Sequence, residues 1–332
     1  MIGRIGLAAL ALASAAPLAA QAIQLPPTAV PAQPLTELSD LQARDTRLFA
    51  AGWRLVTGNA EFCDGVTSAI GLLLHDAAAY GRPADVRGEF GLSGDIGVLA
   101  VAPGSPADLA GLAANDTLHS IDGLVLAEAF PPSDPAWQRL VDIKDALDAR
   151  LTGGPVALEW NRQGGASGQS TLAGVPACAS RFEVLASGAG AVADGARVLL
   201  GRDFPGFAYP QDEFAAAVAH ELAHNLLHHR ALLEPLGRPQ ALVRLTERDA
   251  DRLMPWLLAN AGYDPHAAAR FMSRWGPRHG GGLLRKRTHD GWDERVEFIE
   301  TEIAIVERLM AQDGAADWSR QFVPQATAQP PA

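Results

Sequence analysis

The motif HELAH at residues 220–224 combines residue types that can hold a metal ion and use it for hydrolysis. It lies within residues 212–233, which are rich in helix formers and contain neither Gly nor Pro. Positions i and i+4 of a helix share one face, so His220 and His224 can direct two imidazoles at one ion. Zinc lowers the pKa of bound water to about 7, and Glu221 can take a proton from that water during attack on a carbonyl. Incidental histidines on a solvated helical face are the alternative.

A catalytic zinc site needs a third protein ligand and an open fourth position. Glu247 lies 23 residues after His224, and we expect it to open a second helix with Asp251 at i+4 on the same face. Glu247 would ligate the ion, and Asp251 would accept the other ring N–H of a ligand histidine. The alternative is an acidic helix start stabilised by the helix dipole. His228 cannot join the set, because three turns of one straight helix do not converge on one ion, so we expect His228 and His229 to form a polar helix end.

These motifs, with AGYDP and THDGWDER further along, resemble the gluzincin family of CAAX prenyl proteases, HtpX and Oma-type peptidases (peptidase family M forty-eight). The resemblance covers residues 178–310 and, more weakly, 35–85. It implies one zinc ion bound by His220, His224 and Glu247. It also implies that Glu221 is the general base and that Asp251 orients a ligand.

The same resemblance extends to the segment after the second helix. Thr288 and His289, with Arg295 six residues on, match a Thr-His-Pro motif of the family, although Asp290 replaces the proline. His289 is thereby expected to stabilise an oxyanion or orient the site, and Arg295 to pair with nearby carboxylates. An ordinary loop histidine is the alternative for His289.

Two departures from the family bear on the substrate. The interval between HELAH and the third ligand is short, which argues against a prenylated or transmembrane substrate. Gly190-Ala191 stands where the family often starts an edge strand with Asn-Ala. An edge strand there would bind extended polypeptide by strand addition, with a substrate preference of its own.

Residues 86–174 have a different texture, with short apolar runs broken by Gly and Pro. The run SPA, AGL, Asn-Asp and IDG within residues 105–123 resembles a PDZ domain, in which glycines permit tight turns. The resemblance implies that Phe90, Gly91 and Leu92 form a carboxylate-binding loop for a C-terminal peptide, with a helix near residues 137–151 as the other wall. A β-rich insertion without a ligand is the alternative.

The N-terminus predicts export. One positive charge precedes an apolar run over residues 5–16, which Pro17 ends, and Ala-Gln-Ala at residues 20–22 suits a signal peptidase. The run is shorter than the roughly 20 residues of a membrane span. We therefore expect a signal peptide (1–22) and a periplasmic or secreted protein without a transmembrane anchor. A buried core helix is the alternative.

The composition and the two cysteines restrict the class of protein and its partners. The chain is 48% hydrophobic and 20% charged, which is typical of globular proteins, and its formal charge is −11. Nucleic acid is an unfavoured partner, because phosphate binding needs clustered Lys and Arg. Cys63 and Cys178 flank the insertion, and in an oxidising compartment they could form a disulfide. Two unpaired buried thiols are the alternative.

The expected fold class is α+β: a mainly helical, zincin-like metallopeptidase core with a small sheet, plus an inserted β-rich PDZ domain. Its parts are the signal peptide (1–22), a linker (23–34), the core (35–85 and 175–315), the PDZ domain (86–174) and a flexible tail (316–332). The expected function is a zinc endopeptidase that cleaves unfolded or envelope proteins. The alternatives are a PDZ-based binding or chaperone-like protein with a structural or inactive zinc site, and a nonproteolytic metal hydrolase. A structural site would not need Glu221.

Overall fold

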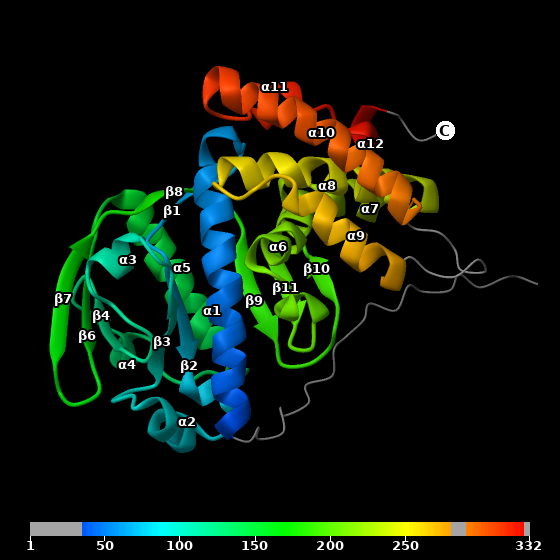
Figure 1. Ribbon diagram of the computed structural model, residues 1–332. Coiled ribbons are helices and arrows are strands. Elements are labelled where there is room, and N and C mark those ends of the chain that lie inside the picture. Colours follow the sequence, from blue (N-terminus) through cyan, green and yellow to red (C-terminus); the bar gives the residue numbers. More distant parts are fainter. Residues whose placement is uncertain (1–34, 280–289, 329–332) are drawn as a thin grey trace, which may run out of the picture.

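The computed structural model describes residues 35–279 and 290–328, and over these residues the fold is mixed α+β (Figure 1). The chain forms two bodies, each with a hydrophobic core of its own. One is mainly helical with a small sheet, and the other is built on a larger antiparallel sheet. The α+β prediction is confirmed at the level of class. The predicted signal peptide (1–22) and linker (23–34) lie outside the described residues.

Long helices make most of the first body, and α6 is at its centre. Helices α8 and α9 pack against α6, and α10 covers α8. The run 214–219 of α6 is entirely buried, and its many small alanines allow neighbouring helices to approach closely. The helices of this body are α1 (Leu35–Gly58), α6 (Gln211–Leu226), α7 (His229–Leu233), α8 (Gln240–Asn260), α9 (Ala267–His279), α10 (Trp292–Asp313), α11 (Trp318–Gln321) and α12 (Gln325–Ala328), with the 3-10 helices η1 (Ala60–Phe62), η3 (Pro205–Ala208) and η4 (Glu234–Leu236).

A three-stranded sheet lies beside α6. Its strands are β9 (Arg181–Leu185), β10 (Ala191–Ala193) and β11 (Arg197–Gly201), in the order β10-β11-β9. β11 runs parallel to β9 and antiparallel to β10. Within the described chain β9 and β10 are therefore the two outer strands of this sheet, and β10 is the one that contacts α6.

The second body is an antiparallel sheet in the order β2-β3-β4-β6-β7, with β5 paired to β4. Its core begins before residue 86, the predicted start of the inserted domain. Ile70 and Leu74 belong to this core, and β2 pairs with β3, so residues 70–85 belong to this body. The strands are β2 (Leu72–Asp76), β3 (Ile96–Val101), β4 (Thr117–Ile121), β5 (Leu124–Val125), β6 (Val156–Asn161) and β7 (Ser167–Leu172); the helices are η2 (Ala77–Tyr80), α2 (Pro83–Phe90), α3 (Pro106–Leu109), α4 (Leu126–Ala129) and α5 (Gln138–Gly153).

The two crossings between the bodies lie side by side. β1 (Val66–Ala69) leads out of the helical body and pairs antiparallel with β8 (Val175–Cys178), which leads back into it. Cys63 and Cys178 form a disulfide at this point. The predicted disulfide is therefore confirmed, and it ties together the two ends of the inserted segment.

Helix α1 stands between the two bodies and contacts both sheets (Figure 1). It packs against β9 of the helical body and against β3 of the second body. None of the helices in the described ranges combines the length and the apolarity that a membrane span requires.

Candidate metal centre and peptide groove

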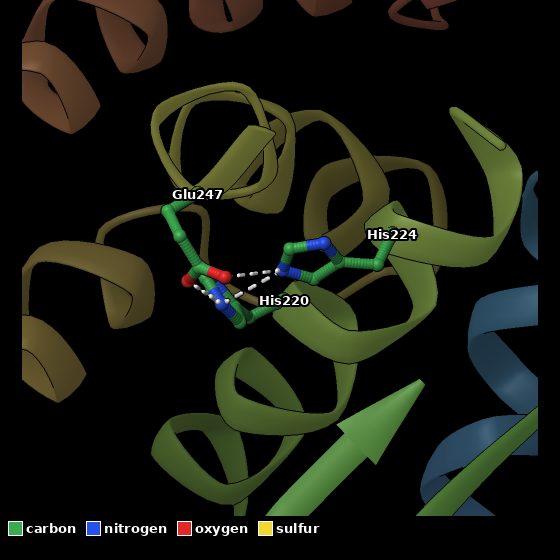
Figure 2. A group of neighbouring side chains, drawn as sticks. All are labelled: His220, His224 and Glu247. Carbon is green, nitrogen blue, oxygen red and sulfur yellow. Dashed lines mark hydrogen bonds and ion pairs between the residues drawn. The ribbon is translucent and has the colours of Figure 1, made fainter. Parts of the chain in front are cut away.

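His220 and His224 lie on the face of α6 that meets α8. Their Nε2 atoms are 3.3 Å apart, and Glu247 of α8 reaches both of them (Figure 2). Glu247 Oε2 lies 3.4 Å from His220 Nε2, and its Oε1 lies 3.6 Å from His224 Nε2. The three side chains are half-buried, and one ligand atom from each falls within 4.8 Å of the others. Two imidazole nitrogens and a carboxylate facing one point are a donor set that suits Zn²⁺.

The helix that carries Glu247 begins earlier than the sequence analysis expected. α8 starts at Gln240, so Glu247 lies two turns inside it rather than at its first turn. The helix dipole acts mainly on the first and last turns, so it does not account for the acidic residues here. Each carboxylate instead has a partner of its own: Glu247 faces α6, Asp249 accepts the backbone N–H groups of Gln325 and Ala326, and Asp251 lies beside His220.

The outer side of His220 is held by a buried ion pair. His220 Nδ1 lies 3.1 Å from Asp251 Oδ1. Arg295 of α10 donates two hydrogen bonds to Asp251, from Nε at 2.5 Å and from Nη2 at 2.7 Å. Asp251 is fully buried and Arg295 is nearly so. The structure thus places both residues where they can hold His220 in one orientation.

The charges around His220 are strongly coupled. Burial lowers the pKa of His220, but its contacts with Asp251 and Glu247 outweigh burial and raise the pKa to about 10. Burial alone would raise the pKa of Asp251, whereas Arg295 and His220 bring it below its ordinary value. The two carboxylates therefore make this point of the protein favourable for a cation.

The outer side of His224 is held differently. Its Nδ1 lies 2.9 Å from Nδ1 of His229, which is 2% exposed. The prediction that His228 and His229 form a polar helix end is therefore wrong for His229. It holds for His228, which is exposed and contacts Asp64 2.9 Å away. The sequence analysis could not predict this contact, because helical spacing does not place a residue beside another one five positions earlier. The contact forms because the chain leaves the helix in a turn at His228.

The remaining predicted residues divide between described and undescribed parts. Glu221 is half-buried and lies three residues before His224 on α6, so the two share a face. His289 lies outside the described residues. Its neighbour Asp290 accepts a hydrogen bond of 2.8 Å from Arg248, the residue that follows Glu247. This contact anchors the start of the following segment beside the metal-ligand cluster.

The predicted carboxylate-binding loop at Phe90, Gly91 and Leu92 is not available for a ligand. Phe90 and Leu92 are buried, and Gly91 takes the left-handed conformation that ends α2. The N–H of Gly91 donates to Gly88, and the N–H of Leu92 donates to the carbonyl of Arg87. Because the helix end uses these donors, this part of the prediction is wrong.

A groove instead follows the outer strand β2 of the second body. A cavity of about 630 Å³ is lined by residues 67–74, by α5 and by β9, and a neighbouring cavity of about 460 Å³ continues along β2. Gly71 and Ala77, which flank β2, both hydrogen-bond to the β3 side. By the alternation of a strand, the backbone groups of Leu72 and Leu74 face the groove. Gly71 has a positive φ of 72°, which turns the chain into this strand.

The groove is also bounded by the helical body. Arg181 of β9 pairs with Asp145 and Asp148 of α5 at 3.0 and 2.7 Å, and Lys144 lies 3.8 Å from Glu183. These contacts fasten α5 to β9, which belongs to the same sheet as β10. A ligand in the groove would thus touch both bodies.

Comparison with known protein families, with curated proteins and with solved structures found no match for this chain. The family resemblance stays a prediction from the sequence motifs.

Proposed function

We propose that the protein is an exported zinc-dependent endopeptidase that cleaves extended or unfolded polypeptide. The observation that carries this proposal is the convergence of His220, His224 and Glu247, with Glu221 next to the first ligand. A site that serves only structure needs no such carboxylate, whereas hydrolysis needs a base beside the ion. The disulfide fits an oxidising compartment, which supports export.

The residues present suggest a division of labour. A zinc ion held by His220, His224 and Glu247 would supply a Lewis acid that polarises a peptide carbonyl and acidifies water. Glu221 would take the proton from the attacking water and hand it to the leaving amine. Asp251 and Arg295 would hold the His220 ring, so that the base and the ligands keep one geometry.

Strand β10 supports an extended polypeptide as the substrate. It is an outer strand that lies next to α6, and Val192 in its middle is 49% exposed. Unpaired backbone groups of an outer strand bind an extended chain by adding it to the sheet. Such a substrate would run past the helix that carries the metal ligands.

The groove along β2 supports a second role in peptide binding, in the manner of a PDZ domain. In this arrangement the turn at Ile70-Gly71, rather than residues 90–92, would be the carboxylate-binding loop. Its position at the start of β2 would put a peptide carboxylate at that end and the peptide strand against Leu72 and Leu74. Because β9 bounds this groove, a peptide bound there would contact the sheet that also contains β10. This supports regulation of cleavage by the bound peptide.

The direct test compares cleavage of an unfolded protein by the mature chain and by its Glu221→Gln variant, each with bound zinc measured. Glu297→Gln on the exposed face of α10 is the matched control. A general base typically contributes 10² to 10⁴ in rate, so we expect a loss of about 100-fold or more in Glu221→Gln alone, with zinc retained.

Equal cleavage by both variants would refute the assignment of Glu221. Zinc binding without cleavage in the wild type would favour the binding-protein alternative. For that alternative, the decisive measurement is a titration of the full chain with an apolar peptide carrying either a free or an amidated C-terminus. Preference for the free carboxylate would support the groove, and equal binding would contradict it.

A further inference from the structure

His229 is a buried histidine in direct contact with a proposed zinc ligand. Its Nδ1 lies 2.9 Å from Nδ1 of His224, while Nε2 of His224 faces the other two ligands. The two rings meet edge to face, with centroids 4.9 Å apart. Two imidazole nitrogens at this distance share one hydrogen, so one ring donates and the other accepts.

The turn between α6 and α7 creates this contact. α6 ends at Leu226, and His228 adopts a left-handed conformation with φ of 53°, which turns the chain sharply. His229 then opens α7 with its side chain under His224 rather than in solvent. His228, a β-carbon-bearing residue at positive φ, is an uncommon solution to a turn, and here it brings His229 back to the metal-ligand cluster.

Metal binding decides which ring donates. A neutral imidazole that binds an ion through Nε2 carries its hydrogen on Nδ1, so His224 must donate to His229. His229 must then be neutral and carry its own hydrogen on Nε2. With the opposite tautomers, the hydrogen of His224 would sit on Nε2 and block the ion.

Within the described part of the chain, the second ring nitrogen of His229 makes no hydrogen bond that competes with the contact to His224. Nε2 of His229 is buried and has no hydrogen-bond partner among the described residues. Buried polar atoms without partners are rare in proteins and call for an explanation.

We infer that His229 is a positioning residue for the metal centre: its Nδ1 accepts the Nδ1–H of His224 and thereby holds that ligand in the tautomer and orientation that bind zinc. The two ligand histidines are then held by different partners, the charged pair of Asp251 and Arg295 for His220 and a neutral ring for His224. This inference rests on the proposed zinc site.

The test measures zinc affinity of the full chain by competition with a chelator, together with thermal unfolding of the zinc-free protein. His229→Leu removes the acceptor, and His229→Asn offers an oxygen near the position of Nδ1. His75→Leu is the matched control, because His75 is also 2% exposed with both ring nitrogens unpartnered, but lies in the other body.

We expect His229→Leu to weaken zinc binding 10- to 100-fold, the usual effect of losing such a partner, while zinc-free stability is unchanged or higher. His229→Asn should recover most of the affinity, and His75→Leu should bind zinc as the wild type does. Wild-type affinity in His229→Leu would overturn the inference. The inference would also be overturned if the loss of zinc affinity in His229→Leu were fully explained by the fraction of the variant that is unfolded.

A measurement on the wild type keeps the inference testable if a variant fails to fold. Nitrogen NMR of histidine-labelled protein with zinc bound should show His229 with its hydrogen on Nε2 and His224 with its hydrogen on Nδ1. The reverse tautomer at His229 would overturn the inference. Failure of the wild type to bind zinc would instead refute the proposed function.

Discussion

Replacing Arg295 by methionine should destabilise the protein far more than breaking an exposed ion pair does. Methionine keeps the apolar bulk of the side chain in the contact between α10 and α8, but it removes the guanidinium. Asp251 would then lose both hydrogen bonds from Arg295 and remain fully buried with a negative charge.

The magnitude follows from the burial and the geometry. Each hydrogen bond between charged groups contributes about 1.5–3 kcal/mol, and there are two here. Breaking a buried pair by removing one partner costs about 3–5 kcal/mol, because the remaining buried charge loses the partner that compensated it. The contact of Asp251 with His220 remains and keeps the loss within this range. The estimate from the two hydrogen bonds and the estimate from the broken buried pair therefore agree on the loss of stability.

The assay is urea unfolding of the zinc-free chain at neutral pH, with circular dichroism as the signal. Arg181→Met is the matched control: this arginine also pairs with carboxylates, at 2.7 and 3.0 Å, but its side chain is 43% exposed. Exposed pairs contribute about 0–1 kcal/mol. A third variant combines Arg295→Met with Asp251→Asn, which removes the unpaired charge.

Three outcomes are expected: a large loss in Arg295→Met, a small loss in the control, and partial recovery in the double variant. A loss below about 1 kcal/mol in Arg295→Met would refute the argument, because it would mean that the buried charge of Asp251 does not depend on Arg295. A double variant as unstable as the single one would show that lost packing, not the unpaired charge, causes the effect.

Two further predictions concern the junction and the groove. Cys63 and Cys178 close a loop of 115 residues, and replacing both by alanine opens it. Urea unfolding should then show a free energy of unfolding lower by about 4–5 kcal/mol, because the unfolded chain regains the entropy of the open loop. An equal free energy of unfolding for the wild type under reducing and oxidising conditions would contradict this. For Asp45, burial raises the pKa from 3.8 to about 7, although the Val184 N–H lowers it. The folded state therefore holds a proton that the unfolded state lacks between about pH 4 and 7, and stability falls as the pH rises through that window. Asp45→Asn keeps the acceptor for Val184 and should be more stable at pH 8 by up to about 4 kcal/mol; an unchanged pH profile of unfolding would exclude a raised pKa.

The sequence predicted the parts of this protein that depend on neighbouring residues. Helical spacing puts residues 220 and 224 on one face whatever surrounds them, so that pair could be read from the motif. The exposed His228 could be excluded as a ligand for the same local reason. The disulfide was one of two open alternatives, because pairing requires the two chain ends to meet.

Other features escaped the sequence because they depend on where a helix ends. The sequence analysis placed the start of a helix at Glu247, but α8 begins at Gln240. The Phe90–Leu92 segment has the residue types of a binding loop, yet its N–H groups close the end of α2. Composition cannot say whether a backbone donor serves a helix end or a ligand, since both uses favour glycine at the turn.

By itself, the sequence determined the chemistry on offer: two imidazoles at helical spacing, a base between them, and acidic residues that could complete the set. Only the tertiary structure decided which groups meet. It brought Glu247 across from α8, set Asp251 and Arg295 behind His220, and turned His229 under His224. The reason is physical: contacts within a helix are fixed by a repeating backbone geometry, whereas contacts between helices depend on how whole side-chain faces pack, and no local rule of spacing specifies that packing.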